Sequence, residues 1–150
     1  MKMIKILLVS LFISVGLAQA DDGLVTMPSQ FSVEETAERF VAAVEAAELK
    51  VFSKIDHAAG AKQVGQSLNP TLLIIFGSPK VGTALMTSDQ RTGIDLPLKA
   101  LIWEDQQAKV WLSYNNPNSL FERFAIKDRE KVRKKVTATL QKFANKATQP

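Results

Sequence analysis

Apolar residues follow two different spacings along the chain, and each spacing predicts a type of secondary structure. The run Leu24–Met27, which Pro28 ends, is predicted to be a first strand. A helix is predicted to begin at Ser32 and to end near Glu48, because Ser32 and Glu35 have capping-box spacing, in which each side chain bonds the other's backbone amide. The apolar residues of this helix recur every three or four positions: Val33, Ala37, Phe40, Val41 and Val44.

Four further segments are predicted to be strands. Residues 49–55 alternate between two faces, and the run 71–76 is apolar enough for a strand covered on both faces. Segments 98–103 and 109–114 are separated by five residues, a spacing that favours a β-hairpin. The positions that share one face in the first of these segments are Leu49, Val51, Ser53 and Ile55.

The remaining segments are predicted to be turns and helices. Residues 57–65 are turn-rich, residues 83–88 and 118–124 indicate short helical elements, and Asp128 is expected to cap a terminal helix. The apolar stripe of that helix is Val132, Val136, Leu140 and Phe143. The order of elements predicts an α+β fold: a single mixed, largely antiparallel sheet of about five strands, packed by two longer helices and short helical turns.

The first twenty residues have the three parts of a secretory signal peptide. Two lysines precede an apolar run from Ile6 to Leu17, and Ala18-Gln19-Ala20 offers the small residues that a signal peptidase accepts. The run is shorter than the ~20 residues that a membrane span needs. We therefore expect cleavage after Ala20, export to the periplasm, and a mature chain, residues 21–150, that forms one domain without a transmembrane segment.

Composition narrows the chemistry that this domain can perform. The chain has no cysteine, which excludes disulfides, thiolate nucleophiles, cysteine-ligated zinc and iron–sulfur clusters. Residues 127–146 hold eight basic and two acidic side chains, whereas residues 21–126 have a net charge of −4. The isoelectric point of about 9.4 therefore reflects the predicted terminal helix rather than the whole fold.

Four motifs follow one another through the middle of the chain. They are Phe76-Gly77-x-Pro79-Lys80-x-Gly82-Thr83-x-Leu85-Met86, Asp95-Leu96-Pro97-Leu98-Lys99, Trp103-Glu104-Asp105, and Tyr114-Asn115-x-Pro117. In this order they resemble the domain of unknown function 302 family, over about residues 31–126. The resemblance implies a compact α+β fold and a homodimer, but no activity. Two residues depart from the family pattern: Ser78 stands where Asn is favoured, and Ala108 where a hairpin Gly is usual.

The segment Gly77–Thr83 is a candidate binding loop, because it follows a strand and precedes a helix. Glycines allow backbone amides to approach a ligand, a helix start favours anions, and Lys80 adds a positive charge. The phosphate-binding P-loop pattern is absent, since Thr83 stands where that motif needs lysine. The alternative is a purely structural turn. The candidate binding residues of this segment are Gly77, Ser78, Lys80, Gly82 and Thr83.

His57 is the only histidine, so any role that needs an imidazole falls on it. A Ser–His–Asp triad with Ser78 and Asp95 lacks the spacing of a nucleophile elbow, and no catalytic residue is assigned. A copper site at His57 and Met86 would have too few soft ligands, so no metal site is predicted. The nature of any cofactor is left open.

Three further residues complete the candidate set. Asp95 and Lys99 flank a proline-stiffened apolar segment, so they can face one cleft or pair with each other. Tyr114 ends its strand with a hydroxyl group that needs a partner where it is buried.

The leading interpretation is an exported, non-catalytic domain that binds a small ligand or an envelope protein, as a homodimer. One alternative is a small enzyme that uses His57 as general acid or base, assisted by Lys80 or Asp95. A second is an envelope-surface protein held by its basic helix, residues 128–146. Export argues against a nucleic-acid partner. A shared binding surface requires the glycine segment and the segment Asp95–Lys99 to converge.

Overall fold

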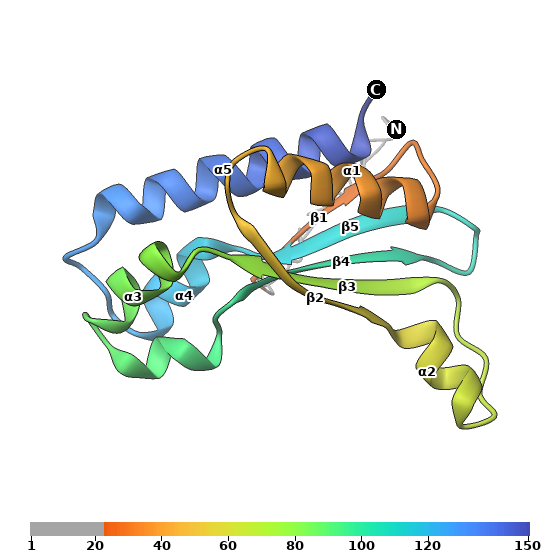
Figure 1. The fold of residues 1–150 in the computed structure, drawn as a ribbon, viewed down its shortest axis with the longest axis horizontal. Helices are drawn as coiled ribbons and strands as arrows, with labels where there is room; N and C mark the ends of the chain where they lie inside the picture. Colours follow the sequence, from red (N-terminus) through yellow and green to blue (C-terminus); the bar gives the residue numbers. More distant parts are fainter. Residues whose placement is uncertain (1–22) are drawn as a thin grey trace, which may run out of the picture.

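Five antiparallel strands form one sheet, and two long helices lie across one of its faces (Figure 1). The computed structural model describes residues 23–150, so the predicted signal peptide and its cleavage site lie outside the described residues. The strand order is β1-β5-β4-β3-β2, and every neighbouring pair is antiparallel. The predicted α+β fold with one sheet is confirmed, and the sheet is wholly antiparallel rather than mixed.

The helices are divided between the inner face of the sheet and its two ends. The strands are β1 (Leu24–Pro28), β2 (Lys50–Asp56), β3 (Thr71–Gly77), β4 (Leu98–Glu104) and β5 (Val110–Asn115). The helices are α1 (Val33–Glu45), α2 (His57–Gln63), α3 (Pro79–Met86), the 3-10 helix η1 (Gln90–Ile94), α4 (Pro117–Arg123) and α5 (Glu130–Thr148). Figure 1 shows α1 and α5 on one face, with α3 and α4 at the end of the sheet opposite α2.

Helix α1 begins where the capping pattern predicts. The Ser32 hydroxyl accepts the backbone N–H of Glu35 at 3.1 Å and so satisfies one of the amides that have no partner within the helix. The helix ends at Glu45, earlier than predicted. Glu48 adopts a left-handed backbone with φ of 58°, which turns the chain towards β2.

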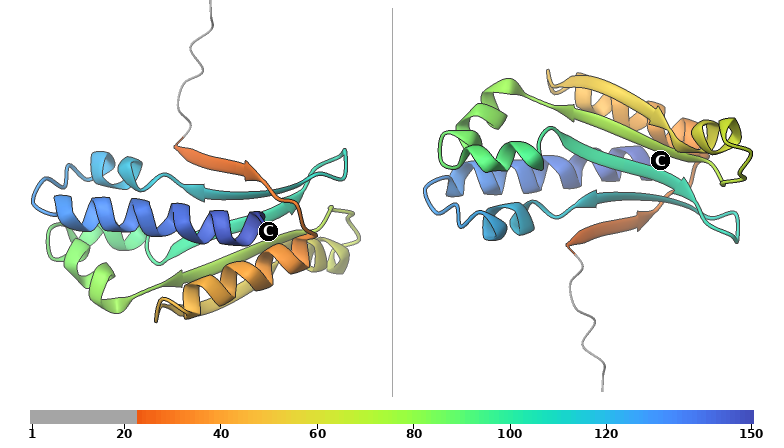
Figure 2. Two further views of the ribbon diagram at one scale, coloured as in Figure 1. Left: turned by 90° about the horizontal axis from the view of Figure 1, so that it is seen from above. Right: turned by 90° about the horizontal axis from the view of Figure 1, so that it is seen from below.

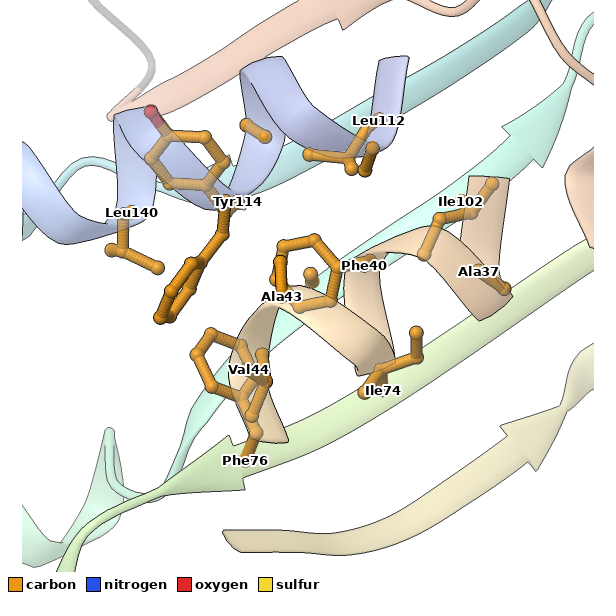
Figure 3. Close-up of a cluster of buried hydrophobic side chains, with 14 of the residues drawn as sticks. Ala37, Phe40, Ala43, Val44, Ile74, Phe76, Ile102, Leu112, Tyr114 and Leu140 are labelled. Carbon is orange, nitrogen blue, oxygen red and sulfur yellow. The ribbon is translucent and has the colours of Figure 1, made fainter. Parts of the chain in front are cut away.

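The apolar stripes of α1 and α5 meet the inner face of the sheet in one core (Figure 3). Phe40 of α1, Phe76 of β3 and Phe143 of α5 pack edge to face, with ring centroids 5.1, 6.1 and 6.4 Å apart. Each such aromatic pair contributes about 0.5–1.5 kcal/mol beyond the area that it buries. Leu140 and Phe143 are buried, whereas Val132 and Val136 are only half-buried, so the C-terminal half of α5 is the part held by the core.

The opposite side of the sheet, which we call the outer face, lies open along β3, β4 and β5 within the described residues (Figure 2, right). Its large apolar side chains are all only partly buried: Leu73, Ile75, Leu101, Trp103 and Trp111. The prediction that the run 71–76 is covered on both faces is therefore wrong for this chain alone. An apolar run indicates that both faces prefer burial, but not that the same chain supplies both covers.

A β-bulge in β2 overturns the predicted alternation of that strand. The register shifts between Val51 and Ser53, so that Val51 is opposite the buried Phe76 and Ser53 is opposite Ile75. Val51 consequently packs against the core, whereas Ser53 lies on the outer face. The four alternating residues thus do not share one face.

Helix α5 begins later than its predicted cap. Arg129 occupies the N-cap position and makes no side-chain capping bond, so the prediction that Asp128 caps the helix is wrong. The Asp128 carboxylate instead accepts the Ser88 hydroxyl at 2.9 Å and pairs with Arg129 at 2.9 Å. The Asp128 carboxylate is therefore occupied by Ser88, which lies 40 residues away in the sequence, and does not cap the backbone amides of α5.

The hairpin between β4 and β5 is organised by one carboxylate. Asp105 accepts the indole N–H of Trp111 at 2.8 Å and the backbone N–H groups of Gln107 and Lys109, both at 2.9 Å. These bonds, the Trp111 bond foremost, hold the pKa of Asp105 below its usual value. Ala108, in the same turn, has a left-handed φ of 58°. This is the position where the family resemblance leads us to expect glycine.

We expect Ala108→Gly to stabilise the protein by about 1 kcal/mol, because glycine adopts a left-handed backbone without the steric cost that a Cβ carries. Chemical denaturation of the purified protein measures this difference. Ala42→Gly, at an exposed position inside α1, is the matched control and should lose about 1 kcal/mol. A loss of stability in both variants would contradict the interpretation of the turn.

Candidate functional site

The N-terminal half of α5 crosses the end of the sheet that carries α3 and α4 (Figure 2, left). Beneath it lies a hollow of about 560 Å³ between α3, α5 and the turn that joins α1 to β2. We call it the α3–α5 hollow. Its volume lies within the range of about 300–1,000 Å³ that small-molecule sites occupy.

The interior of the α3–α5 hollow is apolar, because it opens onto the edge of the hydrophobic core. Phe76 and Phe143, both buried in the aromatic cluster, line its floor. Val81 of α3 and Val136 of α5 line opposite walls. The only uncharged polar side chains of the lining are the hydroxyls of Ser78 and Thr139. A ligand here would displace water from a lining that is mostly apolar.

Charge is confined to three exposed side chains that line this hollow: Glu48, Lys80 and Lys135. Within residues 23–150, neither lysine forms an ion pair. Lys80 comes from the first turn of α3 and Lys135 from α5, so the two cations belong to different walls. The hollow therefore combines an apolar interior with a net charge of +1.

Two of the other basic residues of α5 are paired. Arg133 and Lys134 both approach the Glu130 carboxylate, at 2.7 and 3.8 Å. The Arg133 hydrogen bond, with smaller effects of the nearby charges, lowers the pKa of Glu130. Lys135, one position further along, does not share this carboxylate.

Two smaller hollows adjoin the first one. One, of about 240 Å³, is lined by Gly77, Gly82 and Thr83. The other, of about 210 Å³, is lined by Asp95 and Lys99. Leu98 and Val136 line all three hollows. The glycine segment and the Asp95–Lys99 segment, which includes the start of β4, thus lie next to each other at one end of the molecule.

Asp95 and Lys99 face the same hollow but do not pair with each other. The Asp95 carboxylate accepts two bonds from the Arg123 guanidinium, at 3.0 and 3.2 Å. The Lys99 ammonium instead donates to the backbone carbonyls of Pro97 at 3.2 Å and of Asp95 at 3.5 Å. Of the two predicted arrangements, the shared cleft is the one observed, and Arg123 is the partner that the sequence did not reveal.

The predicted glycine loop is instead the end of a strand and the start of a helix. Helix α3 begins at Pro79 rather than Thr83, because the fixed φ of proline suits the first helical position. Ser78 is the N-cap residue but makes no side-chain capping bond. Gly82 lies inside the helix, where an added Cβ would meet Leu96 and Met86 at an ordinary 3.9 Å. Its backbone amide is bonded to the Ser78 carbonyl rather than free for a ligand.

Two candidate residues lie away from these hollows. His57 is exposed at the start of α2, beyond the Thr71 end of β3, whereas Gly77 is at the other end of that strand. Seven residues of extended chain separate the two ends by about 20 Å. Tyr114 is buried in the core, where its hydroxyl lies 3.4 Å from the Gln141 side-chain oxygen and burial raises its pKa. The structure therefore does not bring His57 together with Lys80 or Asp95, as the enzymatic alternative requires.

Sequence reasoning missed the contribution of α5 to the site. Val136 belongs to the predicted apolar stripe and Lys135 to the basic segment, and neither is among the candidate binding residues. The apolar stripe was a usable signal for Val136, because it continues past the residues that the core covers. No local signal identifies Arg123, since its partner lies 28 residues earlier.

Residues 23–150 contain no group of three or more histidine, cysteine or acidic side chains arranged to hold a metal ion. Over the same part of the chain, no helix has both the length and the hydropathy needed to cross a membrane.

The structure is thus an α+β domain with helices on one face of an antiparallel sheet and an apolar hollow at one end. A family model described as Domain of unknown function DUF302 matches residues 25–147. The chain therefore belongs to this family. The same fold occurs in the crystal structure of an uncharacterized conserved DUF302 protein from Bacillus stearothermophilus, with a TM-score of 0.76 and 12% sequence identity, over 84% of this chain and 98% of that chain.

Curated relatives match the chain at higher sequence identity. Proteins named fluoride-specific ion channel FluC 1, from Brucella suis biovar 1 (strain 1330) and Brucella abortus biovar 1 (strain 9-941), are each 49% identical to this chain over 106 residues. The match covers 71% of this chain but only 42% and 39% of those proteins. The chain thus spans about two fifths of the length of the relatives that it matches.

Proposed function

We propose that this protein is an exported, periplasmic, non-catalytic domain that binds a small ligand in the α3–α5 hollow. One observation carries the proposal: seven of the nine candidate residues border three adjoining hollows that share Leu98 and Val136. An apolar concave site with a few polar groups at its edge is the usual form of a small-molecule site. The names of the Brucella relatives contribute nothing to this proposal, because the shared part is a minor fraction of those proteins.

The ionisable residues of the three hollows support binding rather than catalysis. Asp95 is held by Arg123, and Lys99 is held by backbone carbonyls. Glu48 and Lys80 line the α3–α5 hollow as exposed side chains on its edge. The arrangement supplies recognition of charge and of apolar surface, without a nucleophile beside a general base.

A screen of periplasmic metabolites by thermal shift tests the binding site. At one hundred times its Kd, a ligand stabilises the protein by about 2.7 kcal/mol, which should raise Tm by about 5 °C or more. Val136→Trp fills the hollow from α5 and should abolish the shift. Ala84→Leu fills part of the hollow from α3 with a smaller side chain and should also reduce the shift. Ala138→Trp, exposed on the same helix, is the control and should respond as the wild type does. An equal shift in all four proteins, or none in the wild type, would remove the support for this site.

The proposed location rests on the pattern of the first twenty residues. When the full chain is expressed in a Gram-negative host, we expect it in the periplasmic fraction with Asp21 as its first residue, which intact-mass spectrometry detects. Ala20→Arg should block cleavage, because a large charged residue does not fit where the peptidase needs a small one. Recovery of an uncleaved wild-type chain from the cytoplasm would contradict the proposal.

We propose a homodimer in which two copies pack through their outer faces. Cross-strand neighbours at the centre of this surface are apolar: Leu73 is opposite Leu101, and Trp103 is opposite and stacked on Trp111. Charge lies towards its ends, where Lys99 is opposite Ile75 and the Lys109 ammonium lies over the Trp111 ring. Five strands of this length form a face whose flat area is about 500 Å². Because side chains project from this face, its solvent-accessible area is larger and approaches the ~800 Å² that each partner of a stable complex buries. A second copy offers the same surface, as a two-fold interface requires.

Leu101→Glu should convert this dimer to a monomer, because it places a charge at the centre of the proposed interface. Light scattering after size-exclusion chromatography measures the mass, and circular dichroism confirms folding. Gln107→Glu adds the same charge at the exposed hairpin tip and should leave the dimer intact. If the wild-type protein is still a monomer at about 100 µM, a concentration that exceeds the Kd of most functional complexes, the interface is refuted.

A further inference from the structure

The α3–α5 hollow places two unpaired cations beside an apolar interior. Lys80 and Lys135 line it from α3 and α5, and both are exposed. Long lysine side chains keep their ammonium groups in water while their methylene stems cover apolar surface. The two charges therefore lie at the edge of the hollow, above a floor that includes the buried Phe76 and Phe143.

The charge at this edge is not neutralised by the protein. Arg129, Arg133 and Lys134 each have a carboxylate within ion-pair distance. In the described chain, Lys80 and Lys135 have none. Glu48 lines the same hollow and opposes them, which leaves an excess of one positive charge. A single negative charge on a ligand would complement this excess.

The interior restricts the rest of the ligand. Apart from the hydroxyls of Ser78 and Thr139, the uncharged side chains that line the hollow are apolar. A polar ligand body would leave its hydrogen-bonding groups without partners, at a cost of about 1–3 kcal/mol for each group. An alkyl chain has no such groups and gains about 0.8 kcal/mol for each methylene that it buries.

From these two requirements we infer that the α3–α5 hollow binds an amphiphile with one anionic head group and an acyl chain of medium length, its head at Lys80 and Lys135 and its chain against Phe76, Leu98, Val136 and Phe143. This inference rests on the proposed function and names the class of ligand for the same site. A volume of about 560 Å³ accommodates a chain of this kind without a change in the fold.

Calorimetric titration with decanoate, 1-decanol and decyltrimethylammonium tests the head group, since the three probes share one chain length. Decanoate should bind most tightly and decyltrimethylammonium should not bind. Octanoate should bind about tenfold more weakly than decanoate, because two fewer methylenes are buried. The double variant Lys80→Gln/Lys135→Gln should weaken decanoate about tenfold, the effect of losing a hydrogen bond to a charged group, and should leave 1-decanol unchanged.

The double variant Lys131→Gln/Lys142→Gln is the matched control. It removes the same charge from exposed positions of α5 that do not line the hollow, and decanoate should bind it as it binds the wild type. If 1-decanol binds as tightly as decanoate and the Lys80→Gln/Lys135→Gln variant changes neither, the anionic head group is refuted while the proposed binding site stands. If decanoate and 1-decanol both fail to bind, the amphiphile is refuted, and a metabolite that shifts Tm in the wild type but not in Val136→Trp would still support the proposed function.

Discussion

The packing of Phe143 against Phe40 and Phe76 determines where α5 lies, and the position of α5 determines most of what else the molecule presents. The three rings come from α5, α1 and β3, so one contact joins both long helices to the sheet. It lies in the C-terminal half of α5, where Leu140, Ala144 and Ala147 are also buried. The N-terminal half extends past this anchor towards α3 and α4, and its side chains contact the edge of the core instead of its centre (Figure 1).

The charge distribution along α5 fits this division. Basic residues in the first turns of a helix are unfavourable, because the backbone dipole already places positive charge there. Lys131, Arg133 and Lys134 occupy these positions, and Glu130 is the acidic residue that offsets them. The negative charge that the helix dipole favours in the first turn is thus already supplied by Glu130.

The sequence predicted those parts of the fold that local chemistry determines. The Ser32 cap, the apolar face of α1 and the hairpin after Trp103 follow from residues within a few positions of one another. The failures have distant causes. Asp128 accepts a hydrogen bond from Ser88, and Asp95 accepts hydrogen bonds from Arg123. The bulge after Val51 depends on the pairing of β2 with β3. The convergence of the glycine segment and the Asp95–Lys99 segment could be stated as a hypothesis from the sequence. The wall that α5 adds to the hollow could not, because it depends on how far the helix extends past its anchor at Phe143.

Because α5 is anchored at one end, its two halves have separable roles. Substitutions near Phe143 remove aromatic contacts that join three elements, and their effect on stability should dominate any effect on binding. Val132 and Lys135 are not buried in the core, so changes there alter the shape and charge of the hollow while the anchor remains intact. Under the proposed function, a helix held in this way would allow the lining of the hollow to change at a few positions of one wall while the fold is kept. For the proposed site, the fold alone would therefore not determine the ligand, and the residues that line the hollow would.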